Sequence, residues 1–358
     1  MIAAFANTTT IVVGGAGFVG SALVRRVLRD DPAKIIIIDN LLSADISNIP
    51  DDPRVEFRPG SITADKILSG LPDTADYVFH LATYHGNQSS MHDPLADHEN
   101  NTLTTLKLLE RLKSFKNLKK VVYSSAGCTV AQKTFDDAEA TTEEDPVSLW
   151  LDSPYQISKI IGEFYGNYYF TRHQVPFVKA RFQNVYGPGE ILGAGQWRGT
   201  PATVWRNVTP TFIWKSLHQE GLPVENGGIA TRDFIYVEDI AEGLASCALR
   251  GKPGDTYNIA SGVETSVKEL AELINELTAN PTPIALQPAR VWDRSGKRYG
   301  DPTKAEKDIG FRAKTNLRDG MTQTVVWTRA NQTLIQSCID RHKIFMPELP
   351  TTKSRKAA

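Results

Sequence analysis

The sequence predicts an α/β fold: a doubly wound parallel sheet, followed by a smaller α/β lobe in the C-terminal part. The first reason is that short β-branched runs alternate with helix-like stretches from residue 9 onward. The second is that runs such as "TTIVV", "KIIIID" and "YVFHLA" are rich in apolar residues, as is typical of parallel strands buried on both faces. The third is a change of rhythm at about residue 187, where a Gly-, Pro- and Trp-rich stretch begins.

The first strand-like run leads into a predicted dinucleotide site. It is followed by Gly14, Gly17 and Gly20, and apolar residues then recur with helical spacing. Glycines at this spacing make a tight turn, whose backbone N–H groups approach a pyrophosphate at a helix N-terminus. The next run ends in Asp39, at roughly the 20-residue offset expected for a carboxylate on an adenosine ribose. This carboxylate would repel a 2′-phosphate and Asn40 follows it, so NAD is favoured over NADP.

The later runs continue the alternation. "TLTTLKLLERLKSF" is helical between two strands, "VPFVKARF" is a further strand, and "RDFIYVEDIAEGLASCAL" returns to a strand and then a helix. We also expect a helix over 265–280, because Ser266 is a good N-cap residue and Glu269 follows three residues later.

Two lobes of unequal size are expected from a chain of 358 residues. The first, which holds the cofactor, comprises 1–184 together with about 231–262. The second, which holds the substrate, comprises 185–230 together with about 263–340. The polar residues 341–358 are expected to form a flexible tail.

The composition excludes several classes of protein. Lys+Arg 40 against Asp+Glu 41 gives a net charge of -1, which does not suggest a partner such as nucleic acid. The three cysteines are far apart, so neither a disulfide framework nor a metal site is indicated. We find neither a signal peptide nor an apolar run long enough to span a membrane, and we expect a cytoplasmic protein.

The stretch "SPYQISKIIGE" predicts a site of proton transfer. Tyr155 and Lys159 are four residues apart on an expected helix and therefore share a face. A neighbouring ammonium lowers the pKa of a phenol, which can then exchange a proton near neutral pH. The lysine can also hold the ribose of a nicotinamide cofactor. The position of this pair after a dinucleotide turn favours catalysis over a surface pair.

Taken together, these motifs resemble the extended short-chain dehydrogenases/reductases that act on nucleotide sugars. The resemblance covers about residues 9–330 and follows the family's order in "GGAGFVG", "IIDN", "HLAT", "NNTLTTLKLLE", "YQISK", "RFQNVYGPG", "RDFIYVEDIA" and "YNIASG". It implies a Rossmann-type domain carrying NAD and a smaller lobe that closes over a nucleotide-diphosphate sugar. Such enzymes oxidise the sugar, usually at C4, to a keto intermediate and usually return the hydride.

The resemblance also implies roles for single residues. Tyr155 would be the base and Lys159 its partner, with Ser125 and Cys128 as further catalytic candidates. The cofactor site would comprise, besides that pair, Gly14, Gly17, Phe18, Val19, Asp39, Asn40, Ser61, Ile62, Leu81, Ala82, Thr83 and Asn101. The substrate site would comprise Tyr84, His85, Asn184, Asn207, Arg232 and Arg298. Arginines suit a diphosphate because their planar fork binds oxygen atoms in pairs.

The chain departs from the family pattern at two places. Ser61 stands where an acid often contacts the adenine. In "VVYSSAGCTV", Ala126 stands where many relatives carry the hydroxyl that shares the sugar's O4 proton. Ser124, Ser125 and Thr129 are candidates to replace that hydroxyl. The 4,6-dehydratases of the family usually carry an Asp-Glu pair here, and this chain supplies no such acids.

Cys128 has three interpretations, which the sequence leaves open: an inert packing residue, a catalytic acid/base beside a keto-sugar, and a redox sensor. GDP-mannose 3,5-epimerases resemble this stretch, since they carry a cysteine acid/base where Cys128 falls. The lysine that they use as a second base is absent, because Val208 precedes Thr209 and Pro210 here.

The leading hypothesis is an NAD-dependent 4-epimerase of a nucleotide-diphosphate sugar. The second is a C3/C5 epimerase or dehydratase that uses Cys128. A third, of another class, is a non-catalytic regulator that binds NAD or a nucleotide sugar. The family further implies a homodimer formed through a four-helix bundle, and the helices expected over 98–113 and 153–170 have apolar faces that suit it.

Overall fold

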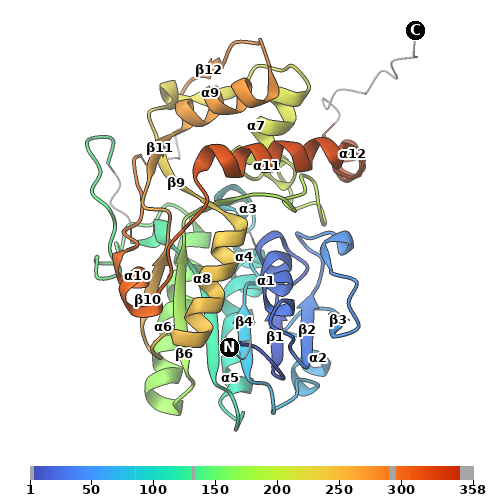
Figure 1. Ribbon diagram of the computed structural model, residues 1–358, viewed down its shortest axis with the longest axis vertical. Helices are drawn as coiled ribbons and strands as arrows, with labels where there is room; N and C mark the ends of the chain where they lie inside the picture. Colours follow the sequence, from blue (N-terminus) through green and yellow to red (C-terminus); the bar gives the residue numbers. More distant parts are fainter. Residues whose placement is uncertain (1–3, 85, 131–133, 290–295, 347–358) are drawn as a thin grey trace.

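A computed structural model describes residues 4–84, 86–130, 134–289 and 296–346. Seven parallel strands form the central sheet in the order β10-β6-β5-β4-β1-β2-β3 (Figure 1). Their bounds are β1 Thr9–Val13, β2 Lys34–Asp39, β3 Val55–Pro59, β4 Tyr77–His80, β5 Lys120–Ala126, β6 Phe177–Phe182 and β10 Thr256–Ile259. The order reverses between β1 and β4, and this switch point creates a crevice at the carboxyl ends of the strands. The predicted doubly wound sheet is confirmed.

Alternate residues of each strand serve two separate cores, one on each face of the sheet. Val12 packs in the core covered by α1 and α8, whereas Ile11 and Val13 pack in the core covered by α5 and α6. The helices around the sheet are α1 Phe18–Leu28, α2 Asp65–Ser69, α3 Asn87–His92, α4 Pro94–Asp97, α5 Thr104–Leu112, α6 Pro154–His173, α8 Val237–Arg250 and α10 Thr303–Ile309. A π-helical segment, His98–Leu103, joins α4 to α5.

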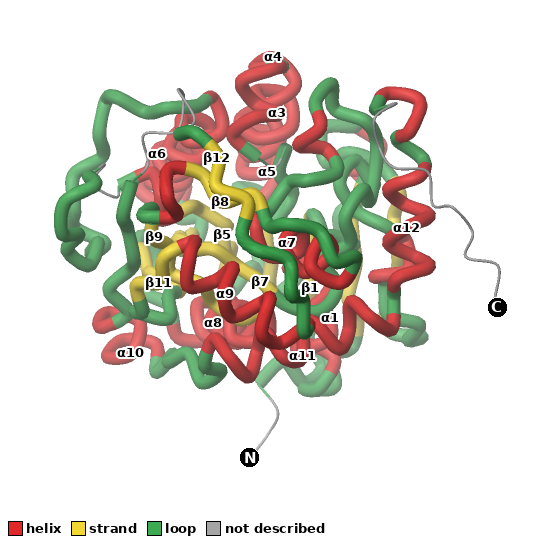
Figure 2. Tube along the Cα trace, turned by 90° about the horizontal axis from the view of Figure 1, so that it is seen from above, coloured by secondary structure: helices red, strands yellow, loops and turns green. Residues whose placement is uncertain are grey.

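A smaller lobe lies over the carboxyl ends of the strands, as the view from above shows (Figure 2). It contains a three-stranded sheet, β11-β9-β7, and a parallel pair, β12-β8. Its strands are β7 Asn184–Tyr186, β8 Pro223–Glu225, β9 Thr231–Tyr236, β11 Glu264–Ser266 and β12 Ala285–Gln287, and its helices are α7 Val208–Leu217, α9 Val267–Thr278, α11 Leu317–Ala330 and α12 Gln332–Asp340. The predicted cap of α9 is confirmed, because Ser266 and Glu269 form a capping box.

The long loop between β7 and α7 is held from two sides. The Gln196 backbone N–H donates to the Leu42 carbonyl at 3.0 Å, which ties the loop to the segment after β2. On the other side, the Trp197 ring stacks on Phe345 with centroids 4.9 Å apart. Arg341 also donates to Asp45 at 3.0 Å. Residues 341–346 are therefore packed, so the expected flexible tail began too early; residues 347–358 lie outside the described part.

No helix in the described part of the chain has the length and apolar character needed to cross a bilayer.

Candidate functional site

A cavity of about 890 Å³ opens between the sheet and the smaller lobe. It gathers nearly all of the described residues that the sequence and the resemblance assigned to a site. They are Gly14, Gly17, Phe18, Val19, Asp39, Asn40, Ser61, Ile62, Leu81, Ala82, Thr83, Ser125, Cys128, Tyr155, Lys159, Asn184, Asn207, Arg232 and Arg298. Tyr84 and Asn101 do not line the cavity, and His85 lies outside the described residues.

The turn between β1 and α1 has room for a ligand and none for larger side chains. Gly14 has φ +88°, and a Cβ there would overlap the backbone of Ala82 at the end of β4. A Cβ at Gly20 would overlap the Gly14 carbonyl oxygen. The helix begins at Phe18 without a side-chain cap, which leaves its first N–H groups available, and Gly17, Phe18 and Val19 line the cavity. This cradle fits a dinucleotide pyrophosphate.

Asp39 is held at the end of β2 by backbone donors. Its Oδ2 accepts from Ala16 N at 3.1 Å and its Oδ1 from Leu41 N at 2.8 Å. Burial raises the pKa of Asp39, and these backbone hydrogen bonds work against that rise. The carboxylate is thus oriented in the cavity wall beside the glycine turn, where a ribose diol would lie.

Tyr155 and Lys159 share one face of the first turns of α6. The Lys159 Nζ donates to the Ser124 carbonyl at 2.9 Å and lies 5.7 Å from the centre of the Tyr155 ring. Burial lowers the pKa of Lys159 to about 8, although the Asp97 carboxylate opposes that fall. The pKa of Tyr155 differs from our expectation: burial of the ring raises it, as do the nearby Cys128 and Asp97. In the protein alone, desolvation therefore favours the neutral phenol.

The end of β5 places its hydroxyls differently from the family pattern. Ser125 Oγ donates to Glu163 Oε1 at 2.5 Å, inside a buried ion pair between Glu163 and Arg181. Ser124 Oγ instead lies 3.4 Å from Lys159 Nζ, beside the reactive pair. The buried bond to Glu163 disfavours Ser125 as the replacement hydroxyl. The Ser124 hydroxyl donates to the His80 carbonyl at 3.1 Å, so both hydroxyl protons are engaged within the protein. Cys128 is half-buried and lines the cavity.

Asn101 supports the cavity wall from behind. Its Oδ1 accepts from Thr83 Oγ1 at 3.0 Å and from Tyr84 N at 2.6 Å, and its Nδ2 donates to Asp97 at 2.7 Å. These bonds fix the loop after β4, so that Thr83 lines the cavity. They also turn Tyr84 inward, where its buried ring lies under Arg198. Tyr84, which we expected to contact the substrate, therefore does not line the cavity.

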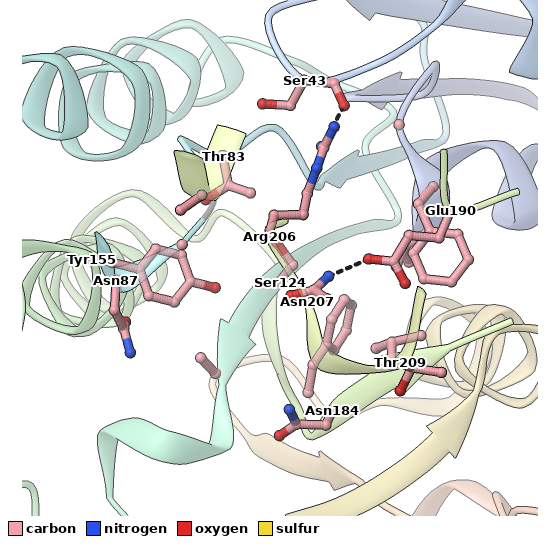
Figure 3. A pocket seen from close by; sticks show the side chains of 18 of the residues that line it. Ser43, Thr83, Asn87, Ser124, Tyr155, Asn184, Glu190, Arg206, Asn207 and Thr209 are labelled. Atoms are coloured by element: carbon pink, nitrogen blue, oxygen red, sulfur yellow. Dashed lines mark hydrogen bonds between the residues drawn. The ribbon is translucent and has the colours of Figure 1, made fainter. Parts of the chain in front are cut away.

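The smaller lobe contributes the polar groups expected for a substrate. Asn184 begins β7, and Asn207 precedes the first residue of α7. Arg232 donates to the Gly296 carbonyl at 2.6 Å, which fixes it near the segment of Arg298. Figure 3 shows Asn184, Asn207 and Thr209 on the side of the cavity opposite Tyr155.

Asn48, Glu190 and Arg206 are among the polar residues of the cavity wall that were not predicted. Arg206 donates to the Ser43 carbonyl at 2.9 Å and to the Ala194 carbonyl at 2.8 Å, and thereby joins the long loop to the segment after β2 (Figure 3). Glu190 accepts from Asn207, and burial raises its pKa to about 7. In the sequence, Glu190 and Arg206 are only two charged residues in a Gly- and Trp-rich stretch. Nothing in that stretch indicates that their side chains are buried.

Comparison with known proteins agrees with this geometry. Residues 10–260 match the model of the NAD dependent epimerase/dehydratase family. The UDP-glucose 4-epimerase of Mycolicibacterium smegmatis is 30% identical over 325 residues, with 89% of this chain and 98% of the relative covered. A putative UDP-glucose 4-epimerase of Methanocaldococcus jannaschii is also 30% identical, over 328 residues, with 90% of this chain and 98% of the relative covered.

A solved structure is more similar still. The Bordetella bronchiseptica enzyme WbmF, crystallised with NAD+ and UDP, is 58% identical, with a TM-score of 0.87; the match covers 96% of this chain and 98% of WbmF.

Proposed function

Because this chain belongs to the NAD dependent epimerase/dehydratase family, we propose that it epimerises a UDP-sugar at C4 through a transient 4-keto intermediate. The chain is an NAD-dependent enzyme of nucleotide sugars, and the choice of carbon and of uridine is the proposal. One observation carries it: the glycine turn, the Tyr155–Lys159 pair and the polar groups around Asn207 line one cavity. Uridine is supported by the curated 4-epimerases and by WbmF, which was crystallised with UDP.

The chemistry requires a base at O4 and an acceptor for the hydrogen at C4. NAD, held by the glycine turn and Asp39, would supply the acceptor for that hydrogen as a hydride and the donor for its return. Tyr155 takes the O4 proton, and Lys159 keeps a positive charge beside the phenolate that forms. Asn207, Arg232 and Arg298 hold the nucleotide while the keto-sugar rotates and presents its other face. When the hydride returns to the other face, Tyr155 gives its proton back and the C4 epimer results.

Dehydration at C5 and C6 is disfavoured by the end of β5. A dehydratase must protonate a leaving hydroxyl, and acids at this place would do so. The described residues of this segment that line the cavity are Ser124, Ser125, Ala126 and Cys128, none of which is a carboxylic acid.

Cys128 favours a second candidate, epimerisation at C3 or C5. The C4 ketone acidifies the hydrogens on its neighbouring carbons, and a thiol in the cavity could exchange them. Cys128 lines the cavity close enough to Tyr155 and Lys159 to affect the pKa of both. This proximity is the observation that favours epimerisation at C3 or C5 as the second candidate.

Solvent deuterium separates the two candidates. The purified protein is incubated in D2O with NAD and a panel of nucleotide sugars, and the products are followed by NMR. C4 epimerisation leaves every carbon-bound hydrogen in place, whereas reaction at C3 or C5 introduces deuterium there. Tyr155→Phe should lose activity in either case while still binding NAD, and full activity in this variant would refute the assignment. Cys128→Ser should leave a 4-epimerase active and stop a C3/C5 epimerase.

We further propose that the protein is a cytoplasmic homodimer. Ile157, Phe164 and Tyr168 lie at helical spacing on α6 and are 46%, 57% and 54% exposed. Apolar side chains repeated on one helix face suit packing against a second copy. Together with α5, this face would build the four-helix bundle.

A further inference from the structure

Glu190 is a buried carboxyl group in the wall of the cavity. The residue is 6% exposed, and its Oε1 accepts a hydrogen bond from Asn207 Nδ2 (Figure 3). Its other oxygen, Oε2, has no hydrogen-bond partner in the described part of the chain. An unpartnered oxygen of a buried carboxyl group is costly, and one that lies in a cavity wall can be satisfied by a ligand.

The position of Glu190 is between two helix N-termini. The preceding Gly189 carbonyl accepts from Asn48 Nδ2 at 3.2 Å, and a Cβ at Gly189 would lie 3.8 Å from the Phe18 ring at the start of α1. Asn207, on the other side, directly precedes α7. Helix N-termini attract phosphate groups. The α1 N-terminus belongs to the dinucleotide cradle, so a sugar-nucleotide diphosphate at the α7 N-terminus would come close to Glu190.

A carboxylate at this place would repel such an anion. Burial raises the pKa of Glu190 to about 7, against the opposing effects of the Asn207 hydrogen bond and the Arg206 guanidinium. Arg206 is itself buried and interacts with Arg198 and Cys338 behind it. The group is therefore poised between its two protonation states near neutral pH. A diphosphate adds negative charge and favours the neutral acid, which can donate a hydrogen bond that the carboxylate cannot.

We propose that Glu190 takes up a proton from solvent when a sugar nucleotide binds, and that its neutral carboxyl group donates a hydrogen bond toward the diphosphate. Glu190 is thus a substrate-binding residue that links affinity to pH. This inference rests on the proposed function, because it requires a nucleoside-diphosphate sugar in the cavity.

Proton uptake is measured by isothermal titration of the NAD-loaded protein with UDP-glucose, in buffers of different ionisation enthalpy. The wild type should take up about half a proton at pH 7, approaching one proton as the pH rises, and its affinity should fall about tenfold per pH unit above that range. Glu190→Gln keeps the shape and stays neutral, so its affinity should vary little with pH and match the wild type at low pH. Glu272→Gln, an exposed change on α9, should behave as the wild type.

Lys159 also titrates near this range. Because Lys159 is present in both the wild type and Glu190→Gln, the difference in proton uptake between the two proteins belongs to Glu190. The proposal is overturned if the wild type binds without proton uptake, or if Glu190→Gln takes up the same fraction of a proton. Weaker binding of Glu190→Gln by one factor at every pH would also overturn it, since that result means an ionised carboxylate holding sugar hydroxyls. If Glu190→Gln does not fold, Lys159→Met takes its place: proton uptake that persists in this variant belongs to Glu190, and its loss overturns the proposal. Failure of every nucleotide sugar to bind is a different result, which refutes the proposed function itself.

Discussion

Replacing Lys159 by methionine should stabilise the cofactor-free protein while abolishing its activity. Methionine has a similar length and no charge, so it removes the cost of burying an ammonium group. That cost follows from the pKa of Lys159, which falls from its ordinary value of 10.5 to about 8. Each factor of ten in proton affinity corresponds to about 1.4 kcal/mol, so the buried charge costs about 3 kcal/mol at neutral pH.

The pH dependence has a definite sign. Between about pH 8 and pH 10.5 the unfolded wild type binds a proton at this lysine that the folded protein has lost, so the stability of the wild type rises with pH. Lys159→Met lacks this rise, because nothing titrates at the position. The variant should be about 3 kcal/mol more stable at pH 7, and the difference should shrink towards zero near pH 10.5. Titrations shared by both proteins cancel in the difference.

Urea unfolding of both proteins at several pH values measures this difference directly. The matched control is Lys268→Met, at an exposed lysine of α9, which should change stability little and equally at each pH. Two results would refute the reasoning: a Lys159→Met protein less stable than the wild type at pH 7, or a difference that does not change with pH. Either one would mean that the hydrogen bond to Ser124 outweighs desolvation.

Four further changes test other parts of the site, the core and the proposed dimer. Gly14→Ala should reduce NAD affinity by more than tenfold in a fluorescence titration, because its Cβ overlaps the backbone at the end of β4; unchanged affinity would show that the turn is not the cofactor cradle. Asp39→Ala should weaken the binding of NAD and reduce the preference for NAD over NADP, as measured by the dissociation constants of the two cofactors. An unchanged ratio of these constants would contradict the assignment of Asp39 to the adenosine ribose. Arg181→Met should destabilise the fold by about 3–5 kcal/mol in urea, because Glu163 is left buried without its partner, and adding Glu163→Gln should recover part of the loss. Phe164→Glu should convert a dimer to a monomer in light scattering, and a wild-type monomer would refute the proposed bundle.

Local sequence was enough to predict the cofactor half of the cavity. The glycine turn, Asp39 and the Tyr155–Lys159 pair each belong to one strand–turn–helix unit or to one helix turn, so their spacing along the chain determines their geometry. The buried apolar runs likewise predicted the parallel sheet. A strand that is apolar on both faces must be covered by a core on each face of the sheet.

The substrate half depended on contacts between distant segments. Glu190 and Arg206 lie in a loop without regular periodicity, and only its packing between β2, α7 and the C-terminal residues buries their charges. Tyr84 shows the same limit, since a hydrogen bond from its backbone to Asn101 decides where its ring points.

The stretch "VVYSSAGCTV" shows what each level decides. The sequence by itself determined that a strand ends there beside the tyrosine–lysine pair, and that Ala126 and Cys128 stand where relatives carry other groups. Only the tertiary structure decided that the Ser125 hydroxyl is held by a buried Glu163–Arg181 pair and that the Ser124 hydroxyl lies beside Lys159. The physical reason is that strand alternation gives each side chain one of two faces, whereas what lies on each face is set by residues far away in the chain.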